Sequence, residues 1–469
     1  MTDLAPFRFR NVGNSLLLTN ELGDFGFFDE NVLDRLFSDT LQKDERQRLR
    51  DLSITLDGEE WRLASLMRRA RQRYGAPQER LSYLIIVPTL RCDLACSYCQ
   101  VSRAAIDARG FDWTEQHLAQ FERFLDRCSG TRLKVEFQGG EPTLRPDLIQ
   151  RVIDICGAKF PNTEFAICTN LTRIPAEMEP ILARPDVVIS TSIDGPLSAM
   201  TANRTGEDST SAAVFNNFQR ILDTYGPKKI SALPTVTEAM IAHPKELVDC
   251  YQALGFQSIF LRPVNYVGFA RKRHGDLSLD YGRWDRFYRE ALDHIVALNR
   301  DGYFEEFYLS LLVRAVFGGL EHGYVDLRSP SRYATDYCVI DYDGTLYPTD
   351  EARMLSRTRS IDLSIGTLAN GFDPEKLNLL NMHAVNQVHP DCTHCAYMPF
   401  CGIDVIDDIS RYGRSDLPKQ DTWFCRRQMS LFDLIFEKVA QRDMAYLQMF
   451  LKWIYRRADP PPTYELFYD

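Results

Sequence analysis

The sequence lacks any segment that would direct it to a membrane or anchor it there. No run of about 18 apolar residues is present, and the N-terminal string MTDLAPFRFRNVGNS contains no apolar stretch after a basic start. Basic residues are also fewer than acidic ones: the sequence has 55 Lys and Arg and 65 Asp and Glu, which gives a formal net charge of −10. A nucleic-acid binder needs a basic face, and an anionic membrane attracts one. We therefore expect a cytoplasmic protein that has neither nucleic acid nor a membrane as a partner.

The sequence also has no internal repeat and no low-complexity tract. A cytoplasmic chain is not expected to form disulfides. The 469 residues nevertheless include 12 cysteines. In a reducing compartment, clustered cysteines are more often metal ligands or catalysts than disulfide partners. Five are scattered, as is typical of small buried apolar residues: Cys128, Cys156, Cys168, Cys250 and Cys338. The other seven form two groups: Cys92, Cys96 and Cys99, then Cys392, Cys395, Cys401 and Cys425.

The chain divides into three regions, 1–80, 81–300 and 301–469. The first region is expected to be a small α+β domain, with a linker at Gly75–Arg80, where Pro77 breaks the pattern. Its predicted strands and helices are Phe7–Phe9, Ser15–Leu18, Glu30–Leu41 and Glu59–Tyr74. The third region is irregular and cysteine-rich, as metal-stapled modules are, and it ends in a predicted helical stretch at Ser430–Tyr455.

The middle region alternates between short apolar runs and amphipathic segments. The predicted strands are Tyr83–Val87, Leu133–Phe137, Glu164–Cys168, Val187–Ile193, Ile230–Val236 and Ser258–Pro263. The predicted helices are Trp113–Cys128, Pro146–Phe160, Ser211–Tyr225 and Pro244–Gly255. Such alternation predicts a parallel α/β sheet or barrel. About six units are visible, fewer than the eight of a complete barrel.

The first cysteine group follows the first predicted strand with the spacing Cys-x3-Cys-x2-Cys. Three thiolates can hold three irons of a cubane and leave the fourth iron open, whereas a structural cluster normally uses four cysteines. An open iron can chelate S-adenosylmethionine (SAM), whose reductive cleavage yields a 5′-deoxyadenosyl radical. A zinc site is the alternative, but zinc favours four ligands and paired x2 spacings.

The segment TLRCDLACSYCQ resembles the radical SAM superfamily. The resemblance implies a partial (β/α)6 TIM-type barrel, a SAM-binding [4Fe–4S] cluster on Cys92, Cys96 and Cys99, and an aromatic, Tyr98, near the adenine. The string FQGGEP ends the second predicted strand and resembles the family's SAM-binding element. Glycines permit close backbone approach, and a carboxylate can accept from an ammonium group. Gly139, Gly140 and Glu141 are therefore expected to contact the SAM amino group.

Polar residues end the next two predicted strands, where barrel active sites are built. They resemble the family's contacts to the SAM ribose and carboxylate: Asn170, Ser192, Asp194 and, further on, Arg204. An arginine can pair with a carboxylate. Turn or capping chemistry is the alternative for Asn170 and Asp194, and a solvated surface charge is the alternative for Arg204.

The second cysteine group could bind zinc or an iron–sulfur cluster on chemical grounds alone. The region from Cys338 to Cys425 resembles a SPASM domain, the auxiliary-cluster module of peptide-modifying radical SAM enzymes. Two cysteines of that pattern are replaced, by Thr349 and Val405, and both belong to the ligand set of the barrel-proximal cluster. The resemblance therefore implies one auxiliary [4Fe–4S] cluster, with Cys338 not required as a ligand. Its ligands would be Cys392, Cys395, Cys401 and Cys425.

Asp350 follows Thr349 in the string YPTDEARM. In similar sulfatase-maturating enzymes an aspartate at this place is the proposed base that takes a proton from the substrate. The alternative is an ordinary surface acid.

The whole chain resembles most the maturases of the His-Xaa-Ser peptide system. This resemblance implies a radical SAM enzyme that crosslinks or oxidises a ribosomally made precursor peptide, with a reductant such as flavodoxin or ferredoxin. Many similar enzymes bind a leader peptide by strand addition to a domain placed like residues 1–80. The alternatives are a sulfatase-type formylglycine maturase and a non-catalytic zinc scaffold that recognises peptides.

Overall fold

The computed structural model describes residues 3–74, 81–128, 130–273, 281–318 and 332–468. The linker predicted at Gly75–Arg80 lies outside them. The chain begins with a three-stranded antiparallel sheet in the order β1-β2-β3. Its elements are β1 (Phe7–Val12), β2 (Ser15–Asn20) and β3 (Phe25–Phe28), followed by α1 (Val32–Phe37), α2 (Lys43–Asp51) and α3 (Glu60–Tyr74). These three strands and three helices agree with the α+β structure predicted for residues 1–80.

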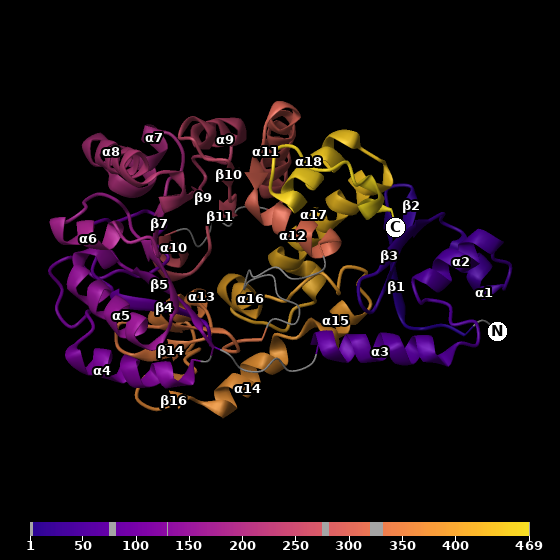
Figure 1. Cartoon of the computed structure of the whole chain (residues 1–469), viewed down its shortest axis with the longest axis horizontal. Coiled ribbons are helices and arrows are strands. Elements are labelled where there is room, and N and C mark those ends of the chain that lie inside the picture. The colour runs from indigo at the N-terminus through magenta and orange to yellow at the C-terminus, as the bar shows by residue number, and fades with distance from the viewer. Residues whose placement is uncertain (1–2, 75–80, 129, 274–280, 319–331, 469) are drawn as a thin grey trace.

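Five parallel strands form the sheet in the left half of the view in Figure 1, with helices outside them. The strands are β4 (Tyr83–Thr89), β5 (Arg132–Gly139), β6 (Asn162–Cys168), β7 (Val187–Ser192) and β8 (Ile230–Leu233). The connecting helices are α4 (Glu115–Phe124), α5 (Pro146–Lys159), α6 (Glu179–Leu182), α7 (Leu197–Met200), α8 (Asp208–Tyr225) and α9 (Pro244–Ala253). This mixed α/β architecture with a parallel sheet confirms the predicted fold class.

The alternation along β5 shows how the sequence produces two different faces. Leu133, Val135 and Phe137 are buried in the main core, whereas Glu136 and Gln138 are only partly buried. Since successive strand residues point to opposite faces, the apolar set packs under the helices and the polar set faces the concave side of the sheet. The concave side therefore carries partly buried polar side chains, which are candidates for a functional site.

The last two predicted strands of the barrel are shorter and more broken than expected. Ile230–Val236 divides into β8 and β9 (Thr235–Val236), and Ser258–Pro263 divides into β10 (Ser258–Ile259) and β11 (Arg262–Pro263). β8 belongs to the main sheet of the described residues, whereas β9 pairs with β11 and β10 pairs with β12 (Glu305–Glu306) outside it. Pro234 and Pro263 lack the N–H donor that a continuous ladder needs.

The main sheet continues into the C-terminal half of the chain. β13 (Tyr337–Ile340) pairs in parallel with β4, and β14 (Thr345–Tyr347), β15 (Gly366–Thr367) and β16 (Gly371–Phe372) follow as antiparallel strands. Within the described residues this makes a nine-stranded sheet with strands from both sides of residue 300. The remaining helices are α10 (Gly268–Arg273), α11 (Tyr281–Asp301), α12 (Phe307–Phe317), α13 (Asp350–Arg357), α14 (Pro374–His383), α15 (Pro390–Thr393), α16 (Val405–Tyr412), α17 (Trp423–Ala440) and α18 (Met444–Tyr455).

The helical stretch predicted at Ser430–Tyr455 is two helices rather than one. α17 ends at Ala440, and Arg442 then adopts a left-handed backbone conformation (φ 54°) before Asp443 caps α18. A left-handed residue reverses the chain direction after a helix. α17 and α18 can therefore pack on each other and on α12.

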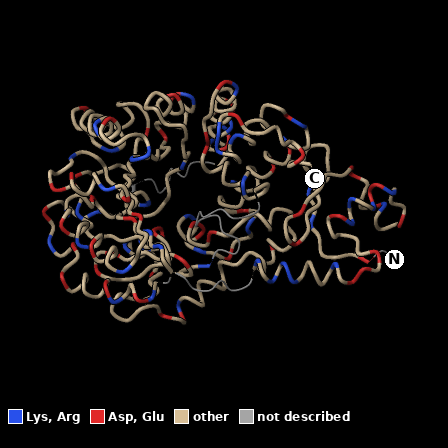
Figure 2. Tube along the Cα trace, viewed as in Figure 1, with Lys and Arg blue, Asp and Glu red and all other residues tan. Residues whose placement is uncertain are grey.

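The N-terminal sheet packs against the C-terminal half, close to the second cysteine group (Figure 1). Thr19 Oγ1 donates to the carbonyl of Ala396 at 3.0 Å, and Arg10 pairs with Asp433 at 2.6 Å. Acidic and basic residues are interspersed over all parts of the trace (Figure 2), so the acidic excess does not gather in one segment. Within the described residues no helix is both long enough and apolar enough to cross a bilayer.

Candidate active site

The first three cysteines lie on the loop that follows β4, at the carboxyl end of the parallel strands. Cys92 N donates to the carbonyl of Ala104 at 3.1 Å, and Cys99 N donates to the carbonyl of Cys96 at 3.2 Å. Each of the three is partly exposed. Burial raises the pKa of the Cys92 thiol to about 12 and also raises the pKa of Cys96, although the positive charge of Arg204 opposes the second shift. Metal ions bind the thiolate, so binding here must release protons.

The two glycines at the end of β5 let that strand contact the cysteine loop. A Cβ atom at Gly139 (φ +134°) would lie 2.2 Å from the carbonyl oxygen of Thr89, and one at Gly140 would lie 2.2 Å from that of Arg91. Instead, Gly140 N donates to Thr89 O at 3.0 Å, and Glu141 N donates to Arg91 O at 2.7 Å. In the structure the glycines therefore fix the loop that carries Cys92.

Gly140→Ala is expected to displace this loop and to reduce the iron that the first site retains, with a destabilisation of about 1–3 kcal/mol, the usual cost of overpacking. The matched control is Gly157→Ala on α5, where an added Cβ meets nothing within 4 Å. Iron content and thermal unfolding of both variants measure the effect. Equal iron binding by the two variants would contradict the assigned role.

Glu141 and Asn170 belong to one buried network beside Cys92. The Glu141 carboxylate accepts from Thr143 N at 3.1 Å and from Asn170 N at 2.7 Å. Asn170 Nδ2 donates to Asp93 Oδ1 at 2.8 Å, and Asp93 Oδ2 accepts from Thr172 Oγ1 at 2.6 Å. Burial raises the pKa of Glu141, while these donors oppose the shift. The sequence analysis missed Asp93, although it directly follows Cys92.

Tyr98, Asp194 and Arg204 form a second buried network on the other side of the cysteine loop. Tyr98 donates its hydroxyl to Asp194 Oδ2 at 2.6 Å and accepts from Arg204 Nη1 at 2.6 Å. Asp194 also accepts from Thr235 N at 3.0 Å. Burial raises the pKa of both Tyr98 and Asp194. Arg204 is thus held by Tyr98 rather than solvated, and its Nε lacks an acceptor among the described residues.

Ser192 is the last residue of β7 and is partly buried, two residues before Asp194. It therefore lies at the carboxyl end of a strand, like Asn170 after β6. The structure brings the predicted SAM-contacting residues to this one end of the sheet.

The second group of cysteines surrounds a cavity of about 240 Å³. Cys392 lies on α15 and Cys425 near the start of α17, while Cys395 and Cys401 lie on the segment between them. Burial raises the pKa of the Cys392 thiol to about 12 and that of Cys425 to about 11, with neighbouring cysteines adding to each shift. All four line the cavity, so its walls offer the sulfur donors that an iron–sulfur cubane requires.

Cys338 lies elsewhere, buried in β13 opposite Leu84 of β4. Thr349 caps α13, because its Oγ1 accepts from Ala352 N at 3.0 Å, and Val405 is the buried first residue of α16. Within the described residues, no three His, Cys, Asp or Glu side chains are arranged to hold a single metal ion.

Asp350 begins α13 and is paired with a buried arginine. Its Oδ1 accepts from Arg353 at 2.9 Å, and Arg353 lies 3.6 Å from Asp341. Burial raises the pKa of Asp350, with Arg353 opposing and the negative charge of Glu136 adding to the shift. Asp350 is therefore not an ordinary surface acid.

Glu136, on the concave face of β5, is a functional candidate that the sequence analysis missed. It accepts from Tyr83 Oη at 2.5 Å, from Gln138 Nε2 at 2.7 Å and from Cys168 Sγ at 3.4 Å. Its negative charge raises the pKa of Asp350, so the two carboxylates lie in the same part of the barrel. The signal was the pair of polar residues, Glu136 and Gln138, near the carboxyl end of a strand in which polar and apolar residues alternate.

A family model described as the Radical SAM superfamily matches residues 86–247. That segment is a radical SAM domain. It contains the cysteine loop, the Gly-Gly-Glu-Pro string and every predicted SAM contact. An uncharacterized protein of Methanocaldococcus jannaschii is 31% identical over 117 residues, which are 24% of this chain and 39% of that protein. The chain thus spans about two fifths of the length of this relative.

Solved structures of two other proteins share the wider fold. The structure of anSMEcpe with bound AdoMet has a TM-score of 0.61 at 16% identity, over 78% of this chain and 99% of that one. The structure of Streptococcus suis SuiB bound to its precursor peptide SuiA has a TM-score of 0.52 at 15% identity, over 90% and 100%. These likenesses extend beyond residues 86–247 and confirm the predicted fold. The predicted site residues remain predictions.

Proposed function

We propose that the chain is a cytoplasmic radical SAM enzyme that modifies a ribosomally made peptide. The observation that carries this proposal is the trio Cys92, Cys96 and Cys99 on the β4 loop, clamped by Gly139 and Gly140. The trio suits a [4Fe–4S] cluster with one open iron. The proposed SAM contacts surround this loop: Tyr98, Gly139, Gly140, Glu141, Asn170, Ser192, Asp194 and Arg204. With SAM bound, such a cluster supplies a 5′-deoxyadenosyl radical.

The proposed substrate class is supported by proteins of similar fold. One anSMEcpe structure contains the Cp18Cys peptide, and the SuiB structure contains SuiA. We infer a precursor peptide as the substrate, a crosslink or an oxidation as the product, and flavodoxin or ferredoxin as the electron donor. Within this class the maturases of the His-Xaa-Ser peptide system are the proposed subgroup. Residues 1–80 are the proposed peptide-recognition domain, 81–300 the barrel and 301–469 the SPASM-like part, with β13 and β14 added to the barrel sheet.

Residues of the barrel interior would accept the proton that the substrate loses during the reaction. Asp350 and Glu136 are carboxylates close enough for their charges to interact. Arg353 holds Asp350 in a fixed direction, while Tyr83 and Gln138 hold Glu136. The four cysteines of the second cavity would hold one auxiliary [4Fe–4S] cluster with no open iron, suited to accept an electron or to hold the C-terminal half together.

The test is an anaerobic assay of the iron-reconstituted protein with SAM and dithionite. We expect 5′-deoxyadenosine and methionine in equal amounts. If no 5′-deoxyadenosine forms while the iron is fully loaded, the proposal is wrong. Two alternatives have separate readouts. A formylglycine maturase would change the mass of a sulfatase peptide, and a zinc scaffold would contain zinc in place of iron and sulfide.

Asp350→Asn is expected to slow peptide modification by about 10- to 100-fold, the usual contribution of a general base, while 5′-deoxyadenosine formation without peptide continues. Because burial raises the pKa of Asp350, its basic form gains population as pH rises. Wild-type modification should therefore increase with pH across the acidic range, and the variant should lose that increase. The control is Asp362→Asn, whose side chain is 67% exposed. A variant that keeps the wild-type pH profile would exclude the assigned role.

A further inference from the structure

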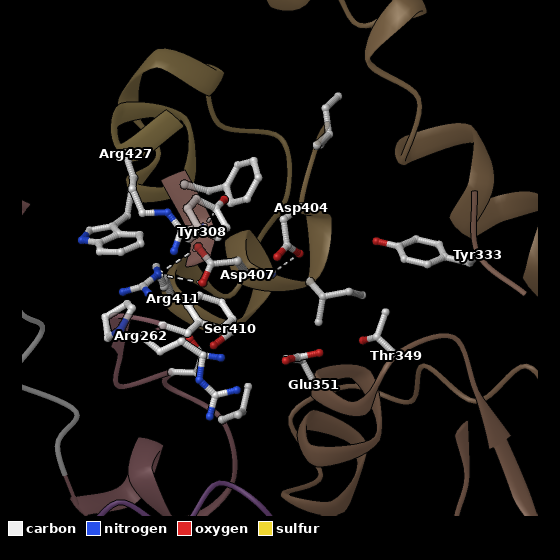
Figure 3. Close-up of a pocket in the computed structure, with 18 of the residues that line it drawn as sticks. Arg262, Tyr308, Tyr333, Thr349, Glu351, Asp404, Asp407, Ser410, Arg411 and Arg427 are labelled. Atoms are coloured by element: carbon white, nitrogen blue, oxygen red, sulfur yellow. Dashed lines mark hydrogen bonds and ion pairs between the residues drawn. The ribbon is translucent and has the colours of Figure 1, made fainter. Parts of the chain in front are cut away.

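A cavity of about 110 Å³ lies at the start of α13 and is lined by residues of the barrel and of the C-terminal half (Figure 3). Its walls come from β11, α12, β13, the start of α13, α16 and α17. Thr349 and Glu351, the sequence neighbours of Asp350, both line it. Three residues line both this cavity and the four-cysteine cavity: Ile403, Asp404 and Phe424. The cavity therefore adjoins the four-cysteine cavity on one side and the start of α13, which carries Asp350, on the other.

Apart from Asp407, which pairs with Arg411, charged side chains of opposite sign lie on different sides of this cavity. In Figure 3, Arg262, Arg411 and Arg427 come from one side, and Glu351 and Asp404 lie across from them. We call the first side the arginine wall. A bound group that touched the arginine wall would meet positive charge in a partly enclosed space, where interactions between charges are stronger than in water.

The arginine wall has more N–H donors than the protein supplies with acceptors. Arg427 donates Nη2 to Tyr308 Oη at 2.9 Å, but its Nε has no acceptor among the described residues. Arg411 donates Nε to Asp407 at 2.9 Å, and its Nη2 likewise has none. The guanidinium of Arg262 lies over the Phe260 ring, 5.8 Å from its centroid, and has no hydrogen bond or ion pair within the part of the chain that the structure describes. A guanidinium carries five N–H donors and no acceptor.

The neighbouring acceptors are already engaged. Both carboxylate oxygens of Asp407 accept from Arg411 Nε. Asp404 Oδ1 caps α16 by accepting from Asp407 N at 2.9 Å. Thr349 Oγ1 caps α13. The Nη2 of Arg411 and the Nε of Arg427 are buried N–H donors without acceptors, which are costly. Together with the partly buried guanidinium of Arg262, they make the arginine wall suited to a ligand that brings acceptors of its own.

We propose that this cavity binds a carboxylate of the peptide substrate, with Arg262 as its direct contact. The carboxylate belongs to an Asp or Glu side chain or to the peptide C-terminus, since the chemistry is the same. A carboxylate matches the fork of a guanidinium in two parallel hydrogen bonds. This inference rests on the proposed function, because it names an anchor for the same peptide. A peptide anchored at Arg262 would pass next to Asp350, because the positive charge of Arg262 is close enough to lower the pKa of that carboxyl group.

Of the two positions where the SPASM-like pattern lacks a cysteine, Thr349 lines this same cavity and Val405 lies between two residues that line it, Asp404 and Ile406. The loss of those two thiols therefore leaves space, bordered by arginines, for a polar ligand. This arrangement gives the chain a substrate pocket at the place that the pattern reserves for cluster ligands.

The test uses three small peptides with the iron-loaded full chain and measures their dissociation constants by ligand-observed NMR. They are N-acetyl-glycyl-glutamyl-glycinamide, its glutamine analogue, and N-acetyl-triglycine with a free C-terminal carboxylate. We expect at least one carboxylate probe to bind about tenfold more tightly than the glutamine analogue, as charge-assisted pairing predicts. The probe that binds identifies the source of the carboxylate.

Arg262→Gln should reduce this preference to within about twofold, and Arg262→Lys should restore part of it, because lysine keeps the charge but loses the fork. The matched control is Arg151→Gln on α5, which removes a 52% exposed arginine and should keep the tenfold preference. No preference in the wild type, or a preference that survives Arg262→Gln, would overturn the proposal. Formation of 5′-deoxyadenosine without peptide should be the same in all variants, so a failure of the radical chemistry is seen separately from a failure of this pocket.

Discussion

Cys92→Ala is expected to abolish 5′-deoxyadenosine formation, with a loss of about 1,000-fold or more, because the open-iron cluster then has only two thiolates to hold it. Cys92 lies at the centre of the site, since Asn170 Nδ2 lies 3.9 Å from its sulfur and Asp93 is its neighbour. About four irons per chain should be lost, while those of the auxiliary cluster remain. Anaerobic product analysis and iron determination measure the two effects.

Cys250→Ser is the matched control for this experiment. Cys250 is a partly exposed residue of α9 and is not part of either cysteine group. It should keep full iron and full activity. Normal SAM cleavage by Cys92→Ala, or the same loss in both variants, would contradict the assignment of the first cluster.

Cys425→Ala is expected to remove the auxiliary cluster and to lower the free energy of unfolding by about 3 kcal/mol or more, since metal binding contributes directly to folding. The cavity it lines is enclosed by α15, α17 and the N-terminal sheet, which contributes Phe9 and Arg10. Losing the cluster should therefore loosen β1 and α17 together. SAM cleavage without peptide should continue, because the first cluster is separate. Thermal unfolding and iron content are the measurements.

The control is Cys338→Ala, which removes a cysteine buried in β13 and outside the cavity. It should cost stability through lost packing but no iron. If Cys338→Ala loses iron and Cys425→Ala does not, the ligand set of the auxiliary cluster is wrong.

Local patterns predicted much of the barrel because its signals are short-range. The apolar run around Ile85 and the amphipathic pattern of Pro146–Phe160 correspond to β4 and α5 within a few residues. The predicted site residues at the ends of β4, β5, β6 and β7 are gathered at one end of the sheet, because the carboxyl ends of parallel strands meet there. Strand order and strand ends together explain why these residues lie near one another.

Long-range contacts were not predictable in the same way. Nothing near Val339 in sequence indicates that β13 pairs with β4, since such pairing depends on packing of the whole chain. The network of Tyr98, Asp194 and Arg204 likewise joins three separate segments. The two cavities are formed by residues from both halves of the chain, so their charge and shape appear only in the folded structure.

The most direct test of the account is the electron paramagnetic resonance spectrum of the dithionite-reduced protein before and after addition of SAM. The account predicts two [4Fe–4S] signals, one of which changes when SAM reaches an iron that no cysteine occupies, while the other stays the same. If neither signal changes at saturating SAM, no iron has an open position for SAM. The proposed cleavage of SAM to a radical would then be excluded.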